Sequence, residues 1–452
     1  MHARRIRPDT APIDRRRLTS AVLSAIVPGL GQAANRESRL ALLFGLPSLA
    51  LLALAVLVLQ GNSTTRLFAS LMVPATLGTV LVLNILVLIW RLVAVTQAFF
   101  DGRFPVRPSA RAVAGLGVIV LFVALPHLVG GWLGYSAFDN FKRVFSASTA
   151  QAATTPGPGD RERLNILLIG VDSGGQRAHA LADTLIVVSL DPVGRHVSMI
   201  SIPRDMVNVP LGDGKTFAPK INSLIEFGDR NPKTFPGGGT KTLERAVGAL
   251  LGIPIHYYAR VNLGGFVRMV NAVGGVDINV ARPLDDPNYG GYGVGPGWSV
   301  TRGLHHFDGA NALAYARIRK AEGESDFTRA ERQQEVLVAI RNAAVKGNLV
   351  FRLTDLLDAV GDTVRTDLPP ERLPGLAALA EEIGGANTTR VVIHAPLVRG
   401  TSNAYGSVQI PDLAAIRAVA AALFPPPGTA PTPWPTPRAT ATPKAPKASP
   451  SP

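Results

Sequence analysis

An α/β domain with a central mixed β-sheet between helical layers is predicted, preceded by an α-helical transmembrane region. Two observations carry this prediction. Hydrophobic residues make up 47% of the 452 residues and charged residues only 17%, which is too apolar for an ordinary soluble protein and indicates membrane segments. From about residue 161 the composition becomes globular, and short apolar runs typical of buried strands interleave with helical patterns, as in α/β proteins.

The apolar N-terminal region contains three stretches long enough to span a bilayer, at about 40–60, 67–90 and 112–134. An earlier apolar piece within 18–33 is too short to span and has basic residues at both ends. We therefore expect it to form an interfacial or re-entrant helix.

Charge predicts the orientation of these spans. Six arginines fall within residues 1–17, and the loop 91–111 is also basic, so the positive-inside rule places both in the cytoplasm. Provided that 21–31 does not cross, three crossings place everything after residue 134 outside the cytoplasm. The formal charge of +14 is thus partly topogenic, and no nucleic-acid partner is expected.

The predicted organisation has four parts. Residues 1–145 are the cytoplasmic basic segment and membrane region, 146–160 a linker, and 161–424 an extracytoplasmic catalytic domain. Residues 425–452 are rich in Pro, Thr and Ala and are expected to be disordered, because they cannot form a core. The absence of cysteine excludes disulfides, thiolate metal sites and cysteine nucleophiles.

Within the catalytic domain, strands and helices alternate. The predicted strands are 164–170, 184–190, 196–202, 257–261, 276–280 and 389–394. The predicted helices are 221–227, 241–251, 263–272, 309–319, 327–345, 349–360, 371–383 and 410–423. The Gly/Pro/Tyr-rich stretch 281–300 is expected to be a loop, long enough to act as a flap over a site.

Two of these helices carry a cluster of arginines. The first begins at Asp308 as N-cap and ends near Arg317 and Arg319, and Asp326 is expected to cap the second. On the second helix, Arg329 and Gln333 are four residues apart and share a face. Converging guanidinium groups beside a helix N-terminus suit a polyanion such as a diphosphate. A solvated, salt-bridged helix face is the alternative interpretation.

Acidic residues stand at the ends of neighbouring strands. Asp172 follows the first strand and Asp183 opens the second, so the two carboxylates could share one Mg²⁺ or Mn²⁺ ion that also binds phosphate oxygens. Alternatively, Asp172 is a turn residue and Asp183 a cap. Arg204 ends the third strand beside Asp205, and is either part of the same site or a structural ion pair.

Together these residues favour phosphoryl transfer, which needs charge neutralisation and alignment of an attacking hydroxyl rather than covalent chemistry from the protein. No P-loop, dinucleotide glycine pattern or Gly-x-Ser-x-Gly elbow is present. His256, His305 and His306 lack metal-ligand spacing.

Seven motifs in this order resemble the LytR-CpsA-Psr family over about 160–400. They are Asn165-Ile166-Leu167-Leu168-Ile169-Gly170-Val171-Asp172, Ala182-Asp183-Thr184, Ser201-Ile202-Pro203-Arg204-Asp205, Lys220-Ile221-Asn222, Gly274-Gly275-Val276, Ala314-Tyr315-Ala316-Arg317-Ile318-Arg319 and Asp326-x-x-Arg329-x-x-Arg332-Gln333-Gln334. The resemblance implies a membrane-anchored extracytoplasmic phosphotransferase. Such an enzyme moves a glycopolymer, for example one like teichoic acid, from a polyprenyl-pyrophosphate carrier to a peptidoglycan hydroxyl, forming a phosphodiester.

The resemblance also implies roles for single residues. It assigns metal binding to Asp172 and Asp183, and pyrophosphate binding to Arg204, Arg317, Arg319, Arg329 and Gln333. The expected catalytic residues are Arg204, Arg317, Arg319 and Asp183, with Asp183 as a candidate base for the acceptor hydroxyl.

This sequence departs from the family pattern at one motif. The family usually has an arginine and a small residue before the second carboxylate, whereas Leu181 and Ala182 stand here and Arg177 lies upstream. The multi-helix membrane region also replaces the usual single span. Two alternatives to transfer remain: hydrolysis of the lipid pyrophosphate by water, and a non-catalytic receptor for lipid carriers.

Overall fold

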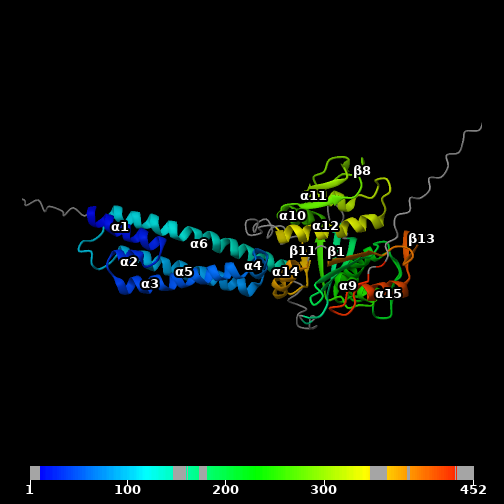
Figure 1. Ribbon diagram of the computed structural model, residues 1–452, viewed down its shortest axis with the longest axis horizontal. Coiled ribbons are helices and arrows are strands. Elements are labelled where there is room, and N and C mark those ends of the chain that lie inside the picture. Colours follow the sequence, from blue (N-terminus) through cyan, green and yellow to red (C-terminus); the bar gives the residue numbers. More distant parts are fainter. Residues whose placement is uncertain are drawn as a thin grey trace, which may run out of the picture. The chain divides into compact units, whose positions relative to one another are not determined.

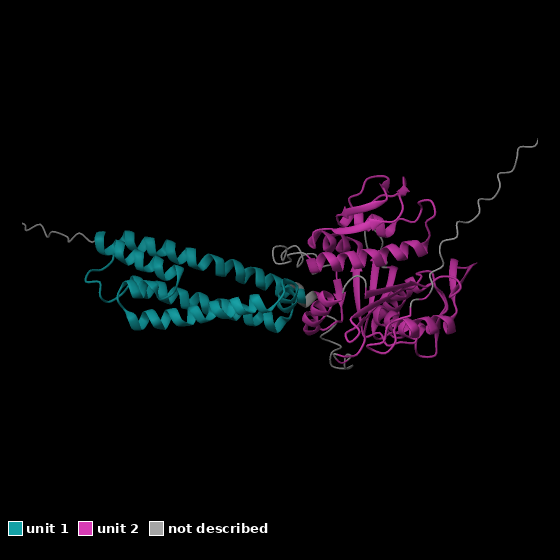
Figure 2. Ribbon diagram, in the orientation of Figure 1, with its two compact units in different colours: residues 1–141 teal, residues 142–452 magenta. Residues whose placement is uncertain are grey.

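The computed structural model of the protein describes residues 11–145, 159, 161–172, 181–346, 364–383, 387–432 and 434. The chain forms two compact units, residues 1–141 and 142–452 (Figure 2). Arg177 and the predicted helix 349–360 lie outside the described residues, as does nearly all of the predicted linker 146–160.

The first unit is helical (Figure 1). Its helices are α1 (Ala11–Ile26), α2 (Leu30–Ala34), α3 (Ser38–Gly61), α4 (Thr64–Leu71), α5 (Pro74–Phe99) and α6 (Ala110–Val144). Among the described residues, three helical segments are long and apolar enough to cross a membrane: Ser38–Gly61, Pro74–Phe99 and Ala110–Asp139. The three predicted stretches are therefore confirmed as candidate spans, and they suggest a membrane anchor.

The predicted bounds of the second span, 67–90, are wrong. Residues up to Leu71 belong to the short helix α4, and the long helix starts only at Pro74, which occupies its first turn. Proline suits that position because the first helical N–H groups have no partner within the helix. The second candidate span consequently runs on to Phe99, nine residues past the predicted end at Trp90.

Helices α1 and α2 are too short to span, in agreement with the prediction for 18–33. They pack against the end of α5 through buried polar side chains. The Arg17 guanidinium donates to the Phe99 carbonyl at 2.9 Å, the Gln32 amide to the Ala94 carbonyl at 2.8 Å, and the Asn35 amide to the Ala98 carbonyl at 2.9 Å. Two of the three acceptors, the Ala98 and Phe99 carbonyls, lie in the last turn of α5, where carbonyls have no partner within the helix.

The second unit contains a six-stranded mixed sheet in the order β11-β6-β1-β2-β3-β12. The pairs β1–β6 and β3–β12 are parallel and the other pairs antiparallel. The strands are β1 (Leu164–Asp172), β2 (Leu181–Asp191), β3 (His196–Ser201), β6 (Tyr257–Asn262), β11 (Val364–Thr366) and β12 (Thr388–Val392). The predicted α/β class with a central mixed sheet is confirmed.

Helices cover both faces of this sheet (Figure 1). One face packs on α8 (Leu224–Arg230), α9 (Gly238–Leu251) and α15 (Leu413–Leu423), and forms the larger apolar core with Leu167, Ile169 and Val187. The other face is covered by α10 (Leu263–Ala272), α11 (Gly309–Arg317) and α12 (Asp326–Lys346). Further helical segments are η1 (Ile221–Ser223), η3 (Pro370–Arg372) and α14 (Leu373–Glu382).

Two predictions on loops and ends need correction and further strands were not predicted, because short strands carry too few residues to show a period. The stretch 281–300 is not one loop but holds the paired strands β8 (Leu284–Asp286) and β9 (Trp298–Val300). The predicted helix 410–423 starts only at Leu413, because β13 (Val398–Asn403) and β14 (Gly406–Pro411) form a hairpin before it. Three more unpredicted strands are β4 (Val209–Pro210), β5 (Thr216–Phe217) and β10 (Gly303–Phe307), the last paired with the predicted β7 (Val276–Val280).

The packed part of this unit also extends beyond the predicted boundary at residue 424. The Gly428 N–H donates to Asp191 Oδ2 at 2.9 Å, the Thr432 N–H to the Ala422 carbonyl at 3.0 Å, and Trp434 packs against the larger core. The predicted disorder is therefore wrong for residues 425–432 and 434, while residues 435–452 lie outside the described part of the chain.

Candidate active site

The site begins at an irregularity between β1 and β2. Gly170 is opposite Thr184, but the next residue, Val171, is opposite Ala182, so Asp183 is an extra residue in β2. Such a β-bulge shifts the alternation of side chains by one position. Ala182 and Leu185 accordingly face the larger core, while Asp183 and Thr184 both face the opposite side.

Asp172 ends β1 on that same side of the sheet. Along β1 the buried side chains of Leu167, Ile169 and Val171 alternate with the half-buried Leu168, Gly170 and Asp172. Because Asp172 is opposite Leu181 in the adjacent strand, the bulge brings Asp183 to the neighbouring position on the same edge. The structure thus places both predicted carboxylates on one face of the sheet.

Gly170 makes this arrangement possible. A methyl group at its Cα would lie 2.9 Å from Thr184 Cβ and 3.1 Å from Thr184 Oγ1, both closer than non-bonded carbon atoms approach. A side chain at this position would therefore displace Thr184. Glycine lets Thr184 pack directly against β1, beside the cavity that both residues line.

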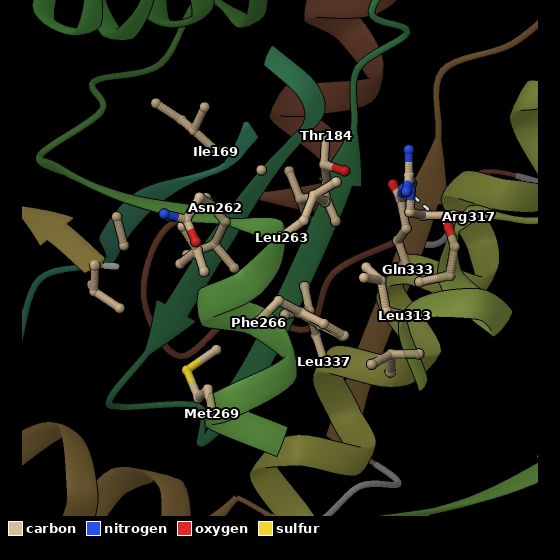
Figure 3. Close-up of a pocket in the computed structure, with 18 residues that line it drawn as sticks. Ile169, Thr184, Asn262, Leu263, Phe266, Met269, Leu313, Arg317, Gln333 and Leu337 are labelled. Atoms are coloured by element: carbon tan, nitrogen blue, oxygen red, sulfur yellow. Dashed lines mark hydrogen bonds between the residues drawn. The ribbon is translucent and has the colours of Figure 1, made fainter. Parts of the chain in front are cut away.

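An apolar cavity of about 280 Å³ lies between this face of the sheet and helices α10, α11 and α12 (Figure 3). Most of its walls are hydrocarbon, from β1, β2, β6 and the three helices. They include Leu168, Ile186, Val261, Leu263, Phe266, Met269, Leu313, Val336 and Leu337. In Figure 3, Arg317, Gln333 and Thr184 bring polar groups to one side of this cavity, while Phe266, Leu313 and Leu337 line its interior.

A second cavity, of about 140 Å³, is lined by charged and polar residues together with some apolar ones. Asp183, Arg204, Asp205, Asp326 and Arg329 all contribute to it. Thr184 and Gln333 line both cavities, so the two adjoin at these residues. The molecule therefore has an apolar compartment and a charged compartment that meet at the β2 bulge.

The predicted arginines form ion pairs with aspartates at this junction. Arg204 Nη1 lies 2.7 Å from Asp183 Oδ1, and Arg329 Nη1 lies 2.7 Å from Asp326 Oδ1. Arg317 Nη2 is 3.5 Å from Asp172 Oδ2, a longer contact. Arg204 was considered a structural partner of Asp205, but the nearer carboxylate is that of Asp183, which belongs to the site.

Two guanidinium donors remain available for an anion. The Nε–H of Arg204 is buried and has no hydrogen-bond partner among the described residues, since Asp205 Oδ2 is 3.7 Å away. Arg319 is exposed and makes no ion pair or hydrogen bond within the described part of the chain. Buried donors without partners are costly, so a ligand that accepts from them is stabilised.

The charges of the cluster influence one another. Burial lowers the pKa of Arg329, Asp326 raises it again, and the nearby charges of Arg204 and Arg319 add to the lowering. For Arg204, burial also acts to lower the pKa, but the ion pair with Asp183 outweighs it and the pKa is raised. Both side chains stay protonated, and the mutual effects indicate that Arg204, Arg319 and Arg329 share one electrostatic environment.

The start of α12 differs from its prediction. Ser325, not Asp326, is the N-cap: its hydroxyl accepts from the Thr328 N–H at 3.2 Å, and its own N–H donates to Thr328 Oγ1 at 2.8 Å. Asp326 is the first helical residue and pairs with Arg329 instead. Asp308 caps α11 as predicted, and the Gln333 amide contacts the Ala316 carbonyl at 3.3 Å, which joins α12 to α11.

Sequence reasoning missed two tyrosines next to Arg317. The Arg317 guanidinium lies 5.9 Å from the centre of the Tyr292 ring, and the Tyr289 hydroxyl is buried without a hydrogen-bond partner among the described residues. Burial raises the pKa of Tyr289 and the charge of Arg317 lowers it, so the two groups are close. Both tyrosines lie in the predicted flap region. The Gly-Gly-Tyr sequence of that region is the feature from which their place in the site could have been predicted.

The described residues contain no group of three or more His, Asp or Glu side chains placed to hold a metal ion. Asp172 and Asp183 nevertheless provide hard oxygen donors on one face of the sheet. Mg²⁺ is commonly bound by one or two carboxylates together with phosphate oxygens and water. This donor set therefore fits a magnesium ion that arrives with a phosphorylated ligand.

A model of the LytR_cpsA_psr family matches residues 137–422, more than half of the chain. The chain belongs to the LytR_cpsA_psr family. The match covers the second unit and leaves most of the helical first unit outside.

Several curated relatives carry the name polyisoprenyl-teichoic acid–peptidoglycan teichoic acid transferase TagU. The one from Enterococcus faecalis is 28% identical over 254 residues, covering 56% of this chain and 76% of that protein. The one from Halalkalibacterium halodurans is 33% identical over 226 residues, covering 50% and 67%. The match to the one from Oceanobacillus iheyensis, 34% identical over 219 residues, covers 48% of this chain and 62% of that protein.

Solved structures of the family are also similar. The crystal structure of Bacillus subtilis TagV is 26% identical, covers 58% of this chain and 98% of its own, and gives a TM-score of 0.46.

Proposed function

We propose that this chain is a membrane-anchored transferase that moves a glycopolymer from a polyprenyl-diphosphate carrier to a peptidoglycan hydroxyl. The observation that carries the proposal is the junction of an apolar and a charged cavity at Thr184 and Gln333. A lipid diphosphate has the same division into hydrocarbon and polyanion. The names of the TagU relatives, which mention polyisoprenyl-teichoic acid and peptidoglycan, support it independently.

The apolar cavity would hold the prenyl units next to the diphosphate. Its volume of about 280 Å³ is too small for a complete long polyprenyl chain, so the rest of the chain would extend out of it. Removal of hydrocarbon from water provides about 25 cal/mol for each Å² buried. Because Phe266, Leu313 and Leu337 offer no hydrogen bonds, this contact discriminates by shape and length rather than by polarity.

The diphosphate would lie at the junction, within reach of four arginines. Arg317 lines the apolar side and Arg204 and Arg329 the charged side, with the unpaired Arg319 next to them. The free Nε–H of Arg204 and the amide of Gln333 would donate to phosphate oxygens. Donors already in position cost no reorganisation when charge develops during transfer.

In the proposed reaction, the oxygen of a peptidoglycan hydroxyl forms a bond to the sugar-linked phosphorus. The bond between this phosphorus and the bridging oxygen breaks, and polyprenyl monophosphate leaves with the electron pair. In this reaction Asp183, which lines the charged cavity, would accept the proton of the hydroxyl as general base. Arg204, Arg317, Arg319 and Arg329 would stabilise charge on the transferred and leaving phosphates.

Asp172 and Asp183 would hold a Mg²⁺ or Mn²⁺ ion, which would neutralise phosphate charge when bound. The two carboxylates are now held by Arg317 and Arg204, so we expect these arginines to turn toward the phosphates when the ion is present. Binding of a short prenyl diphosphate with and without Mg²⁺ would test this assignment. Equal affinity in both conditions would contradict it.

We further propose that the N-terminus is cytoplasmic and the catalytic unit extracytoplasmic, since basic residues concentrate at the N-terminus and in the loop after α5. Reporter fusions after residue 434 would test this. A fusion to alkaline phosphatase should be active. A fusion to a reporter that fluoresces only in the cytoplasm should not fluoresce. The reverse pattern would place the catalytic unit in the cytoplasm and exclude peptidoglycan as acceptor.

The function itself is tested with the purified full chain in detergent, a lipid-diphosphate-linked sugar and peptidoglycan oligomers. We expect a phosphodiester product that is lost in Arg319→Ala and Asp172→Ala and retained in Arg245→Ala. Arg245 is an exposed arginine of α9, on the opposite face of the sheet. Transfer that survives both site variants unchanged would refute the assignment, and phosphate release without acceptor at a similar rate would indicate a hydrolase.

A further inference from the structure

Resting on the proposed function, we propose that the wall of the charged cavity formed by Phe327, Asp205 and Gln409 is a subsite for the acceptor sugar of peptidoglycan. None of these residues is among the predicted metal or diphosphate ligands, although Asp205 Oδ2 lies 3.7 Å from Arg204 Nε. All three line the charged cavity and none lines the apolar one. The argument has three steps: the direction of attack, the chemistry of the wall and its rigidity.

The direction of attack follows from the order of the two cavities. In phosphoryl transfer the attacking and the leaving oxygen are roughly in line through the phosphorus. The leaving group is polyprenyl monophosphate, whose hydrocarbon lies in the apolar cavity. The acceptor hydroxyl must therefore approach from the opposite side of the junction at Thr184 and Gln333, which is the charged cavity.

The wall of that cavity offers the groups that a hexosamine requires. Phe327 presents an aromatic ring, and its edge-to-face contact with His394, with ring centres 6.0 Å apart, fixes the plane of the ring. Sugars pack their C–H faces on aromatic rings and bond their hydroxyl and amide groups to a few polar side chains. The Gln409 amide has no hydrogen-bond partner among the described residues, so it is available to such a ligand.

Gln409 is held in place although it comes from β14, far along the chain from the other residues. Its N–H donates to the Asp205 carbonyl and its carbonyl accepts from the Val207 N–H, both at 3.0 Å. Its side chain lies across Gly400 of β13, where a methyl group would be 3.6 Å from Oε1. The hairpin is thus attached directly to the loop that carries Arg204.

Asp205 is fixed as well. Its Oδ1 accepts from Lys220 Nζ at 2.8 Å, while its Oδ2 is 3.7 Å from Arg204 Nε. A carboxylate held in this way accepts hydrogen bonds from sugar hydroxyls without reorganising. The subsite therefore joins a flat apolar surface, an amide and a carboxylate around the place from which the acceptor must attack.

The test measures binding of a soluble tetrasaccharide of alternating β-1,4-linked N-acetylglucosamine and N-acetylmuramic acid to the full chain in detergent, by isothermal titration calorimetry. We expect Phe327→Ala and Gln409→Ala each to weaken this binding about tenfold or more, the loss of one well-placed contact. Phe327→Leu, which keeps an apolar side chain without the flat ring, should also weaken it. Tyr405→Ala, at the exposed end of the same hairpin, is the matched control and should bind normally.

Geranyl diphosphate binding is measured on the same samples to separate acceptor from donor effects. It should be unchanged in all four variants, which also shows that they are folded. The proposal is overturned if the wild type does not bind the tetrasaccharide, if the variants bind it normally, or if donor affinity falls in parallel. If the wild type transfers nothing but the variants lose tetrasaccharide binding, the subsite stands and the proposed transferase function fails.

Discussion

The two cavities that meet at the β2 bulge share β2 and α12, but most of their other walls come from different elements and differ in polarity. The cavity under α10 is lined by Leu, Ile, Val, Phe and Met, whereas the one beside β3 holds the ion pairs of Arg204 and Arg329. The boundary between them lies at the bulge, where the extra residue Asp183 turns two consecutive side chains of β2 to the same face. Of these two, Asp183 lines only the charged cavity and Thr184 lines both. A lipid-linked polyanion would thus place its hydrocarbon in the apolar cavity and its phosphates in the charged one. Substitutions in the apolar cavity should therefore change lipid binding, and those in the charged cavity should change phosphate binding and transfer.

The largest effect is expected on the charged side. Arg204→Ala should lower the rate of transfer by a factor of about 10³ or more, because it removes the buried donor to the phosphates and leaves Asp183 without its partner. Arg204→Lys should also be strongly impaired, since a single ammonium cannot replace the guanidinium fork. Steady-state kinetics with Arg245→Ala as control measures this, and nearly normal turnover in Arg204→Ala would show that the charged cavity is not the reaction site.

On the apolar side, the effect should depend on the lipid. Leu337→Trp fills part of the cavity, and we expect it to weaken a long-chain polyprenyl donor by about ten- to a hundredfold, because overpacking costs about 1–3 kcal/mol. A sugar diphosphate without a prenyl chain should be affected much less. Comparing KM for the two donors checks this, and an equal loss for both would mean that the substitution does not act through the lipid.

A smaller effect is expected at the tyrosines beside Arg317. Tyr289→Phe removes only a hydroxyl, which is buried without a partner near Arg317, so the folded protein should be as stable or slightly more stable. If the hydroxyl donates to the substrate, kcat/KM should fall about tenfold. Tyr405→Phe is the matched control. A stable Tyr289→Phe enzyme with normal kcat/KM would remove Tyr289 from the site.

The smallest effect on activity is expected from a charged cluster on the other face of the sheet. Lys241 Nζ pairs there with Glu244 at 2.6 Å and with Asp367, and burial raises the pKa of Glu244 from 4.5 to about 7. The folded state therefore binds this proton more tightly than the unfolded chain does. The contribution to stability is complete below pH 4.5 and is lost as the pH rises toward 7.

Glu244→Gln should accordingly flatten the pH dependence of stability between pH 4.5 and 7, by at most about 3 kcal/mol, while transfer at neutral pH stays normal. Thermal unfolding, monitored by tryptophan fluorescence at several pH values, measures the stability. The transfer assay measures the activity. A large loss of transfer would mean that ionic clusters on both faces serve the reaction, and the contrast between them would disappear.

Much of the fold could be predicted because its main elements have clear periods. The three spans, the strands β1, β2 and β3, and helices α10 to α12 follow from apolar runs and helical spacing. The short strands β8, β9, β13 and β14 could not, since three to six residues of mixed polarity show no period. Their positions depend on pairing with distant segments, as in the attachment of Gln409 to the Asp205 carbonyl.

The candidate site likewise has residues whose positions could be predicted from the sequence and residues whose positions could not. Asp172, Asp183, Arg204 and the arginines of α11 and α12 stand at ends of predictable elements, so their convergence could be predicted. The bulge that turns Asp183 and Thr184 to one face could not, because register depends on the partner strand. Nor could Tyr289, Phe327 and Gln409, which reach the site through packing of a loop, a helix start and a hairpin.

The division of the substrate between the two cavities can be tested directly by photo-crosslinking with a lipid-diphosphate-linked sugar that carries a diazirine either on the prenyl chain or on the sugar. Mass spectrometry should locate the prenyl crosslinks on Phe266, Met269 and Leu337, and the sugar crosslinks outside the apolar cavity. Prenyl crosslinks on Phe327 or Gln409, or both labels on the same wall, would contradict the division on which the proposed function rests.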